Sequence, residues 1–126
     1  MSFRYSKDHV WVKKTENGVL VGISDYACKQ LCKGFVLNLP DEDEEFRAGE
    51  VVCDIESCKY FEVVSPVKGK VSLVNEALLD DVSPLVADPY DCWLFEMTDV
   101  AYTQPLMSAN EYAEYLTALD FSAINL

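Results

Sequence analysis

The chain has 126 residues, half of them hydrophobic, and a formal net charge of −12 at pH 7. This length suits one domain with a hydrophobic core, and we expect a single domain over residues 1–126. The excess of acidic residues disfavours binding to nucleic acid and to anionic membranes. No apolar run is long enough to span a bilayer, and the first residues lack a signal- or transit-peptide pattern. We therefore expect a cytoplasmic protein that favours partners with basic docking patches.

Short runs of β-forming residues between turn signals predict a mainly β fold. The runs 10–12 and 19–21 flank an Asn-Gly turn, which is typical of a hairpin. Further strands are expected at 35–39, 70–75 and 92–97. In the run 70–75 the alternation places Val71, Leu73 and Asn75 on one half-buried face.

A short helix is expected after the first hairpin, capped by Ser24 or Asp25 and ending near Leu31. Cys28 and Cys32 are four residues apart and would share one face of this helix. The chain has five cysteines, an odd number without a secretion signal, which argues against a disulfide scaffold. We expect reduced, mostly buried cysteines, with Cys58 as the exposed exception.

The C-terminal part is expected to hold a helical turn at 76–79, a loop at 80–90 and a final helix. The motif Ser108-Ala109-Asn110-Glu111 is a capping box that starts this helix. An apolar stripe at helical spacing would pack on the sheet. Its residues are Ala109, Tyr112, Ala113, Leu116 and Leu119. Together these elements predict a β-sandwich or flattened barrel with a short helix in the N-terminal half and a C-terminal helix.

The most informative segment is a predicted second hairpin in the middle of the chain. The runs 50–55 and 60–64 flank the polar residues 56–59, so Lys59 would lie at or beside the tip. A lysine held at a rigid tip is accessible to a modifying enzyme that acylates its amine. A solvated turn lysine is the simpler interpretation of Lys59 when it is taken alone.

No catalytic constellation is evident in the sequence. His9 is the only histidine, and nothing supplies the partners of a catalytic triad. There is no C-x-x-C pair, so we expect no metal site. A structural hydrogen bond is the interpretation that we favour for His9.

The segment Glu56-Ser57-Cys58-Lys59 resembles the lipoylation loop of the glycine cleavage system H protein family. Tyr5-Ser6-Lys7-Asp8-His9-Val10-Trp11 is similar to the opening pattern of that family, and Gly22-Ile23-Ser24-Asp25-Tyr26-Ala27 to its next segment. Further matches follow in the family's order and near its spacing. They are Ala48-Gly49-Glu50, Ser65-Pro66-Val67, Val74-Asn75-Glu76-Ala77-Leu78, Asp88-Pro89-Tyr90 and Trp93-Leu94. The resemblance covers roughly residues 5–119.

This resemblance implies a lipoyl-type β-sandwich and a carrier that is not itself an enzyme. Lipoate would be attached by an amide bond to Lys59, within a loop that includes Glu56, Ser57, Cys58 and Tyr60. The arm would accept an aminomethyl group from the P protein, a glycine decarboxylase, and deliver it to the T protein, an aminomethyltransferase. The L protein, a dihydrolipoyl dehydrogenase, would reoxidise it, after a lipoate-attaching enzyme had installed it. We expect a monomer, whose chemistry belongs to the cofactor and to these partners.

The sequence departs from the family pattern at several positions. Val10 replaces a glutamate that contacts the amine of the loaded arm, which removes a charge-assisted bond. Leu31-Cys32-Lys33 reverses a charge after the first helix. Cys58 replaces a valine before the lysine, and Tyr60 replaces a small residue after it.

Three hypotheses follow from this comparison. The first is a divergent carrier of the glycine cleavage system. The second is a related lipoyl carrier that serves lipoate relay, or redox or sulfur chemistry in which Cys58 exchanges with the arm's dithiol. The third is an unlipoylated binding module that keeps only the fold.

Overall fold

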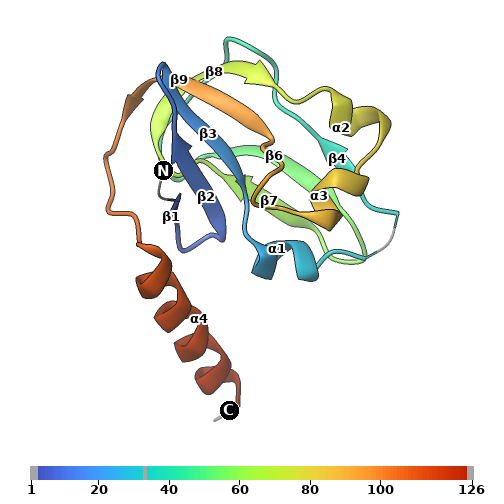
Figure 1. The fold of residues 1–126 in the computed structure, drawn as a ribbon, viewed down its shortest axis with the longest axis vertical. Helices are drawn as coiled ribbons and strands as arrows, with labels where there is room; N and C mark the ends of the chain where they lie inside the picture. The colour runs from blue at the N-terminus through green and yellow to red at the C-terminus, as the bar shows by residue number, and fades with distance from the viewer. Residues whose placement is uncertain (1–2, 33, 125–126) are drawn as a thin grey trace.

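Two antiparallel sheets pack into an open sandwich in the computed structural model, which describes residues 3–32 and 34–124 (Figure 1). The larger sheet has the strand order β1-β2-β3-β9-β8-β5, and the smaller has the order β4-β6-β7. The strands are β1 Phe3–Tyr5, β2 Val10–Lys14, β3 Gly18–Ile23, β4 Val36–Asn38, β5 Glu45–Phe46, β6 Val51–Glu56, β7 Phe61–Val64, β8 Lys68–Val74 and β9 Phe95–Ala101. The mainly β prediction is confirmed.

The main core lies between the two sheets and consists of inward-facing aliphatic and aromatic side chains. Val10, Val21, Ile23, Ile55, Val63, Val71, Leu94, Phe95 and Met97 are all fully buried there. Alternate residues of a strand point to opposite faces, so Trp11, between Val10 and Val12, belongs to a second cluster on the outer face. Tyr5 and Tyr112 complete the buried part of that cluster.

Four helices connect or extend the strands in the described residues: α1 Asp25–Lys29, α2 Ala77–Asp80, α3 Ser83–Ala87 and α4 Ala109–Ile124. The Ser24 side chain caps α1 by accepting a hydrogen bond from the amide of Ala27, at 3.2 Å. None of these helices is long and apolar enough to span a membrane, within the residues described.

The segment 80–90 is not the loop that we expected. Its two prolines suggested irregular structure, but Pro84 occupies the first turn of α3, where its missing amide has no helical partner to lose. Leu85 is fully buried against the core, and the burial of this side chain stabilises the folded segment.

The predicted common face of Val71 and Leu73 is also wrong. Val71 is fully buried, whereas Leu73 is 50 % exposed. The pairing of β8 with β9 shifts between these two residues, so Ser72 lies in a bulge. One additional residue in a strand reverses the side on which the next residue points.

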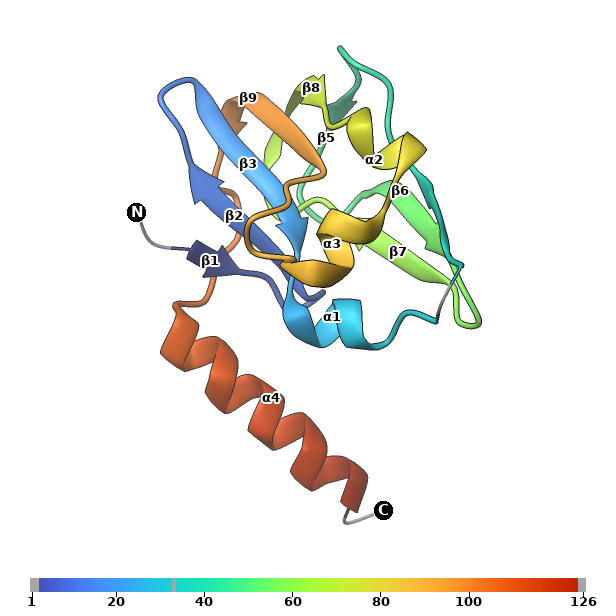
Figure 2. The same cartoon turned by 45° about the vertical axis from the view of Figure 1, so that its right-hand side comes forward.

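The capping box of α4 is confirmed, but its stripe packs on the sheet only in part, through Tyr112 and the half-buried Leu116. Ser108 accepts from the Glu111 amide at 3.2 Å, while the Glu111 carboxylate accepts from the Ser108 amide at 2.9 Å. Of the stripe, only Tyr112 is buried, and Ala109 and Ala113 are exposed. Figures 1 and 2 show why: the helix meets the sandwich at its first turns and then extends away from it.

Candidate functional site

The β6–β7 hairpin presents Lys59 to solvent, as the sequence predicted. Asp54 pairs with Glu62 and Ile55 with Phe61, which leaves residues 57–60 as the connection. Ile55 and Val63 anchor the base of the hairpin in the core, and the Lys59 side chain is exposed. The hairpin therefore combines a fixed root with an accessible amine.

Tyr60, in the position of the family's small residue, braces the outer face of the hairpin. Its hydroxyl donates to Asp54 Oδ2 at 2.6 Å, and Asn38 Nδ2 donates to Asp54 Oδ1 at 2.6 Å. These two hydrogen bonds lower the pKa of Asp54, that from Tyr60 more than that from Asn38. The same bond to the carboxylate raises the pKa of Tyr60 to about 12. The row Asn38–Asp54–Tyr60 thus ties the hairpin tip to β4 through polar contacts.

Ser57 connects the tip to the segment that follows α1. Its Oγ accepts a hydrogen bond from the backbone amide of Cys32 at 2.7 Å. Glu56 ends β6 opposite Val36 of β4 and is exposed. Ser57 and Glu56, two of the four residues that we expected around Lys59, therefore lie at the tip.

Cys32 and Cys58 form a disulfide, which corrects the expectation of reduced cysteines. Their Cα atoms lie 5.7 Å apart, and the bond links the segment after α1 to the residue before Lys59. Cys32 was expected to share a helix face with Cys28, but α1 ends at Lys29, and Cys32 lies beyond it. Figure 2 shows the chain after α1 running beside the β6–β7 turn. The charge reversal at Lys33 lies outside the described residues.

The remaining cysteines are thiols of a different character. Cys53 and Cys92 are buried and Cys28 is half-buried. Burial raises the pKa of Cys53 to about 12, and Asp54 adds to this effect. Burial likewise raises the pKa of Cys28 and of Cys92.

His9 makes the structural hydrogen bond that we favoured. Its Nδ1 lies 2.8 Å from the hydroxyl of Tyr112, which also lies 2.7 Å from Ser24 Oγ. Burial lowers the pKa of His9, and the nearby Asp8 carboxylate opposes this only in part. His9 also adopts a left-handed backbone conformation, with φ of 67°. The imidazole therefore connects the β1–β2 turn to α4.

Val10, where the family pattern described above has a glutamate, is fully buried in the main core. At this position the chain therefore contributes to core packing and presents no carboxylate at the surface.

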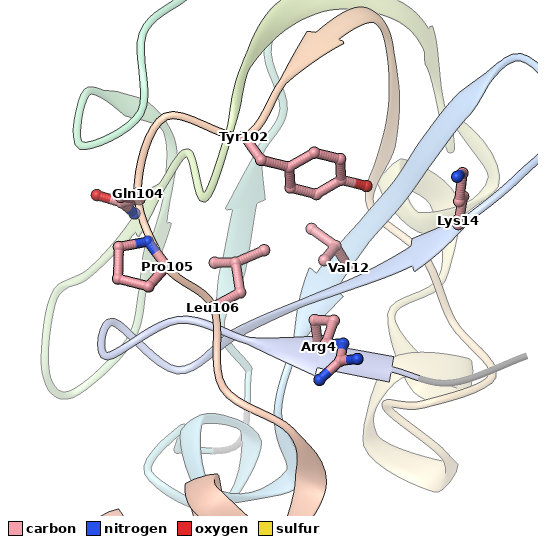
Figure 3. Close-up of a pocket in the computed structure, with 7 residues that line it drawn as sticks. All are labelled: Arg4, Val12, Lys14, Tyr102, Gln104, Pro105 and Leu106. Atoms are coloured by element: carbon pink, nitrogen blue, oxygen red, sulfur yellow. The ribbon is translucent and has the colours of Figure 1, made fainter.

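A solvent-open pocket of about 520 Å³ lies on another part of the molecule. Figure 3 shows it between β1–β2 and the segment that leads into α4. Its lining residues are Arg4, Val12, Lys14, Tyr102, Gln104, Pro105 and Leu106. No residue of the β6–β7 hairpin lines this pocket, so the pocket is separate from the Lys59 site.

Sequence reasoning missed three features of the site: Cys32, Asp54 and Asn38. Cys32 precedes Cys58 by 26 residues, and spacing alone carries no signal for pairing across that distance. Asp54 and Asn38 are ordinary polar strand residues, and their contacts depend on the β4–β6 register. The one available signal was the alternation of β6, which predicts that the Asp54 side chain faces outward.

A sequence model of the family described as "Glycine cleavage H-protein" matches residues 3–119. The chain belongs to the glycine cleavage H-protein family. The members of this family are lipoyl carriers without catalytic activity of their own, so the chain is a carrier component rather than an enzyme.

Individual members of the H-protein family resemble the chain over nearly its full length. A "Probable glycine cleavage system H protein" of Thermococcus kodakarensis is 44 % identical over 120 residues, covering 91 % of this chain and 90 % of that protein. "Glycine cleavage system H protein 1" of Caldanaerobacter subterraneus is 43 % identical over 115 residues, covering 89 % of this chain and 92 % of that protein.

The fold agrees with a solved H-protein structure. The crystal structure of a glycine cleavage system H protein from Mycobacterium marinum superposes with a TM-score of 0.82 at 30 % identity. The match covers 92 % of this chain and 97 % of the other. The sandwich with flanking helices is therefore the H-protein fold.

Proposed function

We propose that this chain is the lipoyl carrier of a glycine cleavage system, with lipoate in amide linkage on Lys59. The arm accepts an aminomethyl group from the P protein and delivers it to the T protein. The L protein reoxidises the arm, and a lipoate-attaching enzyme installs it. Residues 1–126 act together as one carrier domain, and the tethered arm keeps its cargo at high local concentration around successive partners.

One observation carries the proposal: the family's lysine is exposed at the tip of a hairpin rooted in the core. Glu56, Ser57, Cys58 and Tyr60 surround it and form the surface that a lipoate-attaching enzyme would meet. An exposed amine on a rigid tip suits acylation, because the enzyme reaches the nucleophile without unfolding the domain.

The test is the intact mass of the protein purified from a host with active lipoylation, with peptide mapping around Lys59. We expect a lipoyl-sized addition on that peptide, and its loss in Lys59→Arg. Lys7→Arg is the matched control, because Lys7 is also an exposed turn lysine. An unmodified Lys59 in a host whose other lipoyl proteins are modified would contradict the proposal.

Glycine cleavage itself is tested by loading the lipoylated protein with P protein, pyridoxal phosphate and glycine. Formation of the aminomethylated arm, followed as a mass increase on the Lys59 peptide, is the expected result. The burial of Val10 predicts that this loaded arm is less protected than in members with a glutamate there. Its hydrolysis should therefore be faster.

A second candidate function is favoured by the Cys32–Cys58 disulfide beside the attachment site. It is a lipoyl carrier that serves redox or sulfur chemistry, or lipoate relay, outside glycine cleavage. A lipoylated protein that P protein does not load would favour this alternative.

A further inference from the structure

The Cys32–Cys58 disulfide lies against the proposed attachment point. Cys58 is the residue before Lys59, and its side chain is exposed, whereas Cys32 is half-buried. The Cα separation of 5.7 Å is within the ordinary range for a disulfide. The exposed sulfur is therefore open to attack by a thiol, and its more protected partner can act as the leaving group.

The two cysteines are held together by more than their own bond. The Cys32 amide donates to Ser57 Oγ at 2.7 Å, which ties the backbone of the post-α1 segment to the tip. On the other side, Tyr60 is bonded to Asp54, which is bonded in turn to Asn38. These contacts do not involve either sulfur. Opening the disulfide would thus leave two neighbouring thiols that can close again.

Of the described cysteines, only this pair is placed for exchange. Exchange requires a thiolate and an accessible sulfur. Cys53 and Cys92 are buried, and the Cys28 thiol is half-buried and donates to the carbonyl of Leu85 at 3.5 Å. These three are accounted for by packing, whereas an exposed cysteine beside Lys59 is not.

We propose that Cys32 and Cys58 form a second redox couple of this carrier, which takes two electrons from the reduced lipoyl arm. This inference rests on the proposed lipoylation of Lys59. Because the arm and Cys58 belong to adjacent residues, the exchange is intramolecular and proceeds at high effective concentration. The couple would let the carrier store the reducing equivalents of its arm until a partner removes them.

The chemistry balances without a further reagent. One thiolate of the dihydrolipoyl arm attacks Cys58 Sγ, the Cys32–Cys58 bond breaks, and Cys32 leaves as a thiolate that takes up a proton. The second arm sulfur then attacks the arm sulfur that is bonded to Cys58. The lipoyl disulfide closes, and Cys58 is released as a thiolate that is protonated. The dithiol arm is oxidised, and the cysteine pair is reduced by the same two electrons.

The experiment titrates lipoylated protein, isolated without reductant and verified by intact mass, with NADH and a catalytic amount of dihydrolipoyl dehydrogenase. Each disulfide that opens consumes one two-electron equivalent, so the expected uptake is about two equivalents per chain. After acid quenching and alkylation, the label should be found on Cys32 and Cys58.

Three variants test whether the second reducing equivalent is taken up by the Cys32–Cys58 pair. The double variant Cys32→Ser/Cys58→Ser, with its lipoyl group confirmed by mass, should take up about one equivalent. Lys59→Arg should take up none, because the dehydrogenase then has no lipoyl arm to reduce. Cys28→Ser, which keeps a hydroxyl donor for the Leu85 carbonyl, should behave as the wild type.

The outcomes separate this proposal from the proposed function. Absence of the lipoyl mass from Lys59 overturns both. A lipoylated wild type that takes up only about one equivalent and keeps Cys32 and Cys58 unlabelled overturns the redox couple alone. Labelling of the pair in Lys59→Arg under the same conditions also overturns it, because the electrons would then bypass the arm.

Discussion

Two regions of the molecule that match the family's motifs are stabilised by different kinds of interaction. The aromatic cluster of Tyr5, Trp11 and Tyr112 is buried on the outer face of the larger sheet. Tyr5 and Tyr112 stack with ring centroids 4.6 Å apart, and Trp11 Nε1 donates to the Pro89 carbonyl at 3.0 Å. The tip at residues 57–60 is mostly exposed and held by hydrogen bonds and one disulfide.

The difference shows that motif residues have two separate physical roles. In the opening motif, Trp11 and Val10 are fully or almost fully buried, so their contribution is to packing. In the loop motif, Lys59 and Tyr60 face solvent, so their contribution is to what approaches the protein. Substitutions in the cluster should change stability, and substitutions at the tip, apart from those that remove the disulfide, should change chemistry.

The largest expected effect is that of Trp11→Ala. Trp11 is 1 % exposed, contacts Phe3 edge to face with centroids 5.1 Å apart, and covers Gly22. Removing a buried aromatic ring should lower the free energy of unfolding by about 3–5 kcal/mol. Chemical denaturation measures this change. Tyr60→Ala, at an aromatic residue that is 60 % exposed, is the contrasting variant and should leave the midpoint almost unchanged.

Removing the disulfide should have the next largest effect. The bond closes a loop of 26 residues in the unfolded chain, so Cys32→Ser/Cys58→Ser should cost roughly 2–4 kcal/mol in the free energy of unfolding. Urea denaturation with and without reductant provides the measurement. The wild type should respond to reductant and the double variant should not. An equal response of both proteins would show that the stabilisation that reductant removes does not come from the Cys32–Cys58 bond.

His9 should make the stability of the protein decrease at acidic pH. Because burial lowers its pKa in the folded state, the unfolded chain binds a proton more readily. The neutral imidazole's contribution is present above its ordinary pKa of about 6.5 and should be lost as the pH falls below that value.

Denaturation of wild type and His9→Asn near pH 7.5 and near pH 5, on either side of about 6.5, tests this. Asparagine tolerates the left-handed backbone at position 9 and does not titrate. The variant should lose less stability between the two conditions. An identical loss in both proteins would show that His9 is not the acid-sensitive group.

The smallest expected effect is at the exposed brace of the tip. Tyr60→Phe removes the hydrogen bond that contributes most to the lowered pKa of Asp54. The pKa of Asp54 should therefore rise toward its ordinary value, which NMR titration of its carboxyl resonance can measure. Thermal unfolding near neutral pH should barely change, because both side chains are solvent-exposed or nearly so. Asn38→Ala should raise the same pKa by less.

In the wild type, the Tyr60 phenol should favour the folded state below its ordinary pKa of about 10. That contribution should be lost as the pH rises through about 12, where the folded-state phenol ionises. An unchanged alkaline profile in Tyr60→Phe would contradict the role assigned to the brace.

Local features of the chain were sufficient for much of the fold. Hairpin and strand positions followed from alternation and turn residues, and the caps of α1 and α4 followed from Ser24 and from Ser108 with Glu111. These predictions succeed because each depends on residues within a few positions of one another. The exposed lysine at the β6–β7 tip belongs to the same class.

The other features of the fold and of the site depend on contacts between segments that are far apart in the sequence. The register shift that exposes Leu73 depends on how β8 meets β9, and the helix at 83–87 depends on a core site for Leu85. Cys32 reaches Cys58 only because α1 ends early and the chain then passes the hairpin tip. The sequence by itself thus determined the elements and the exposed lysine, through short-range propensity and periodicity. Tertiary packing alone decided that Cys32 is the cysteine that pairs with Cys58 beside that lysine, because neighbours in space need not be neighbours in the chain.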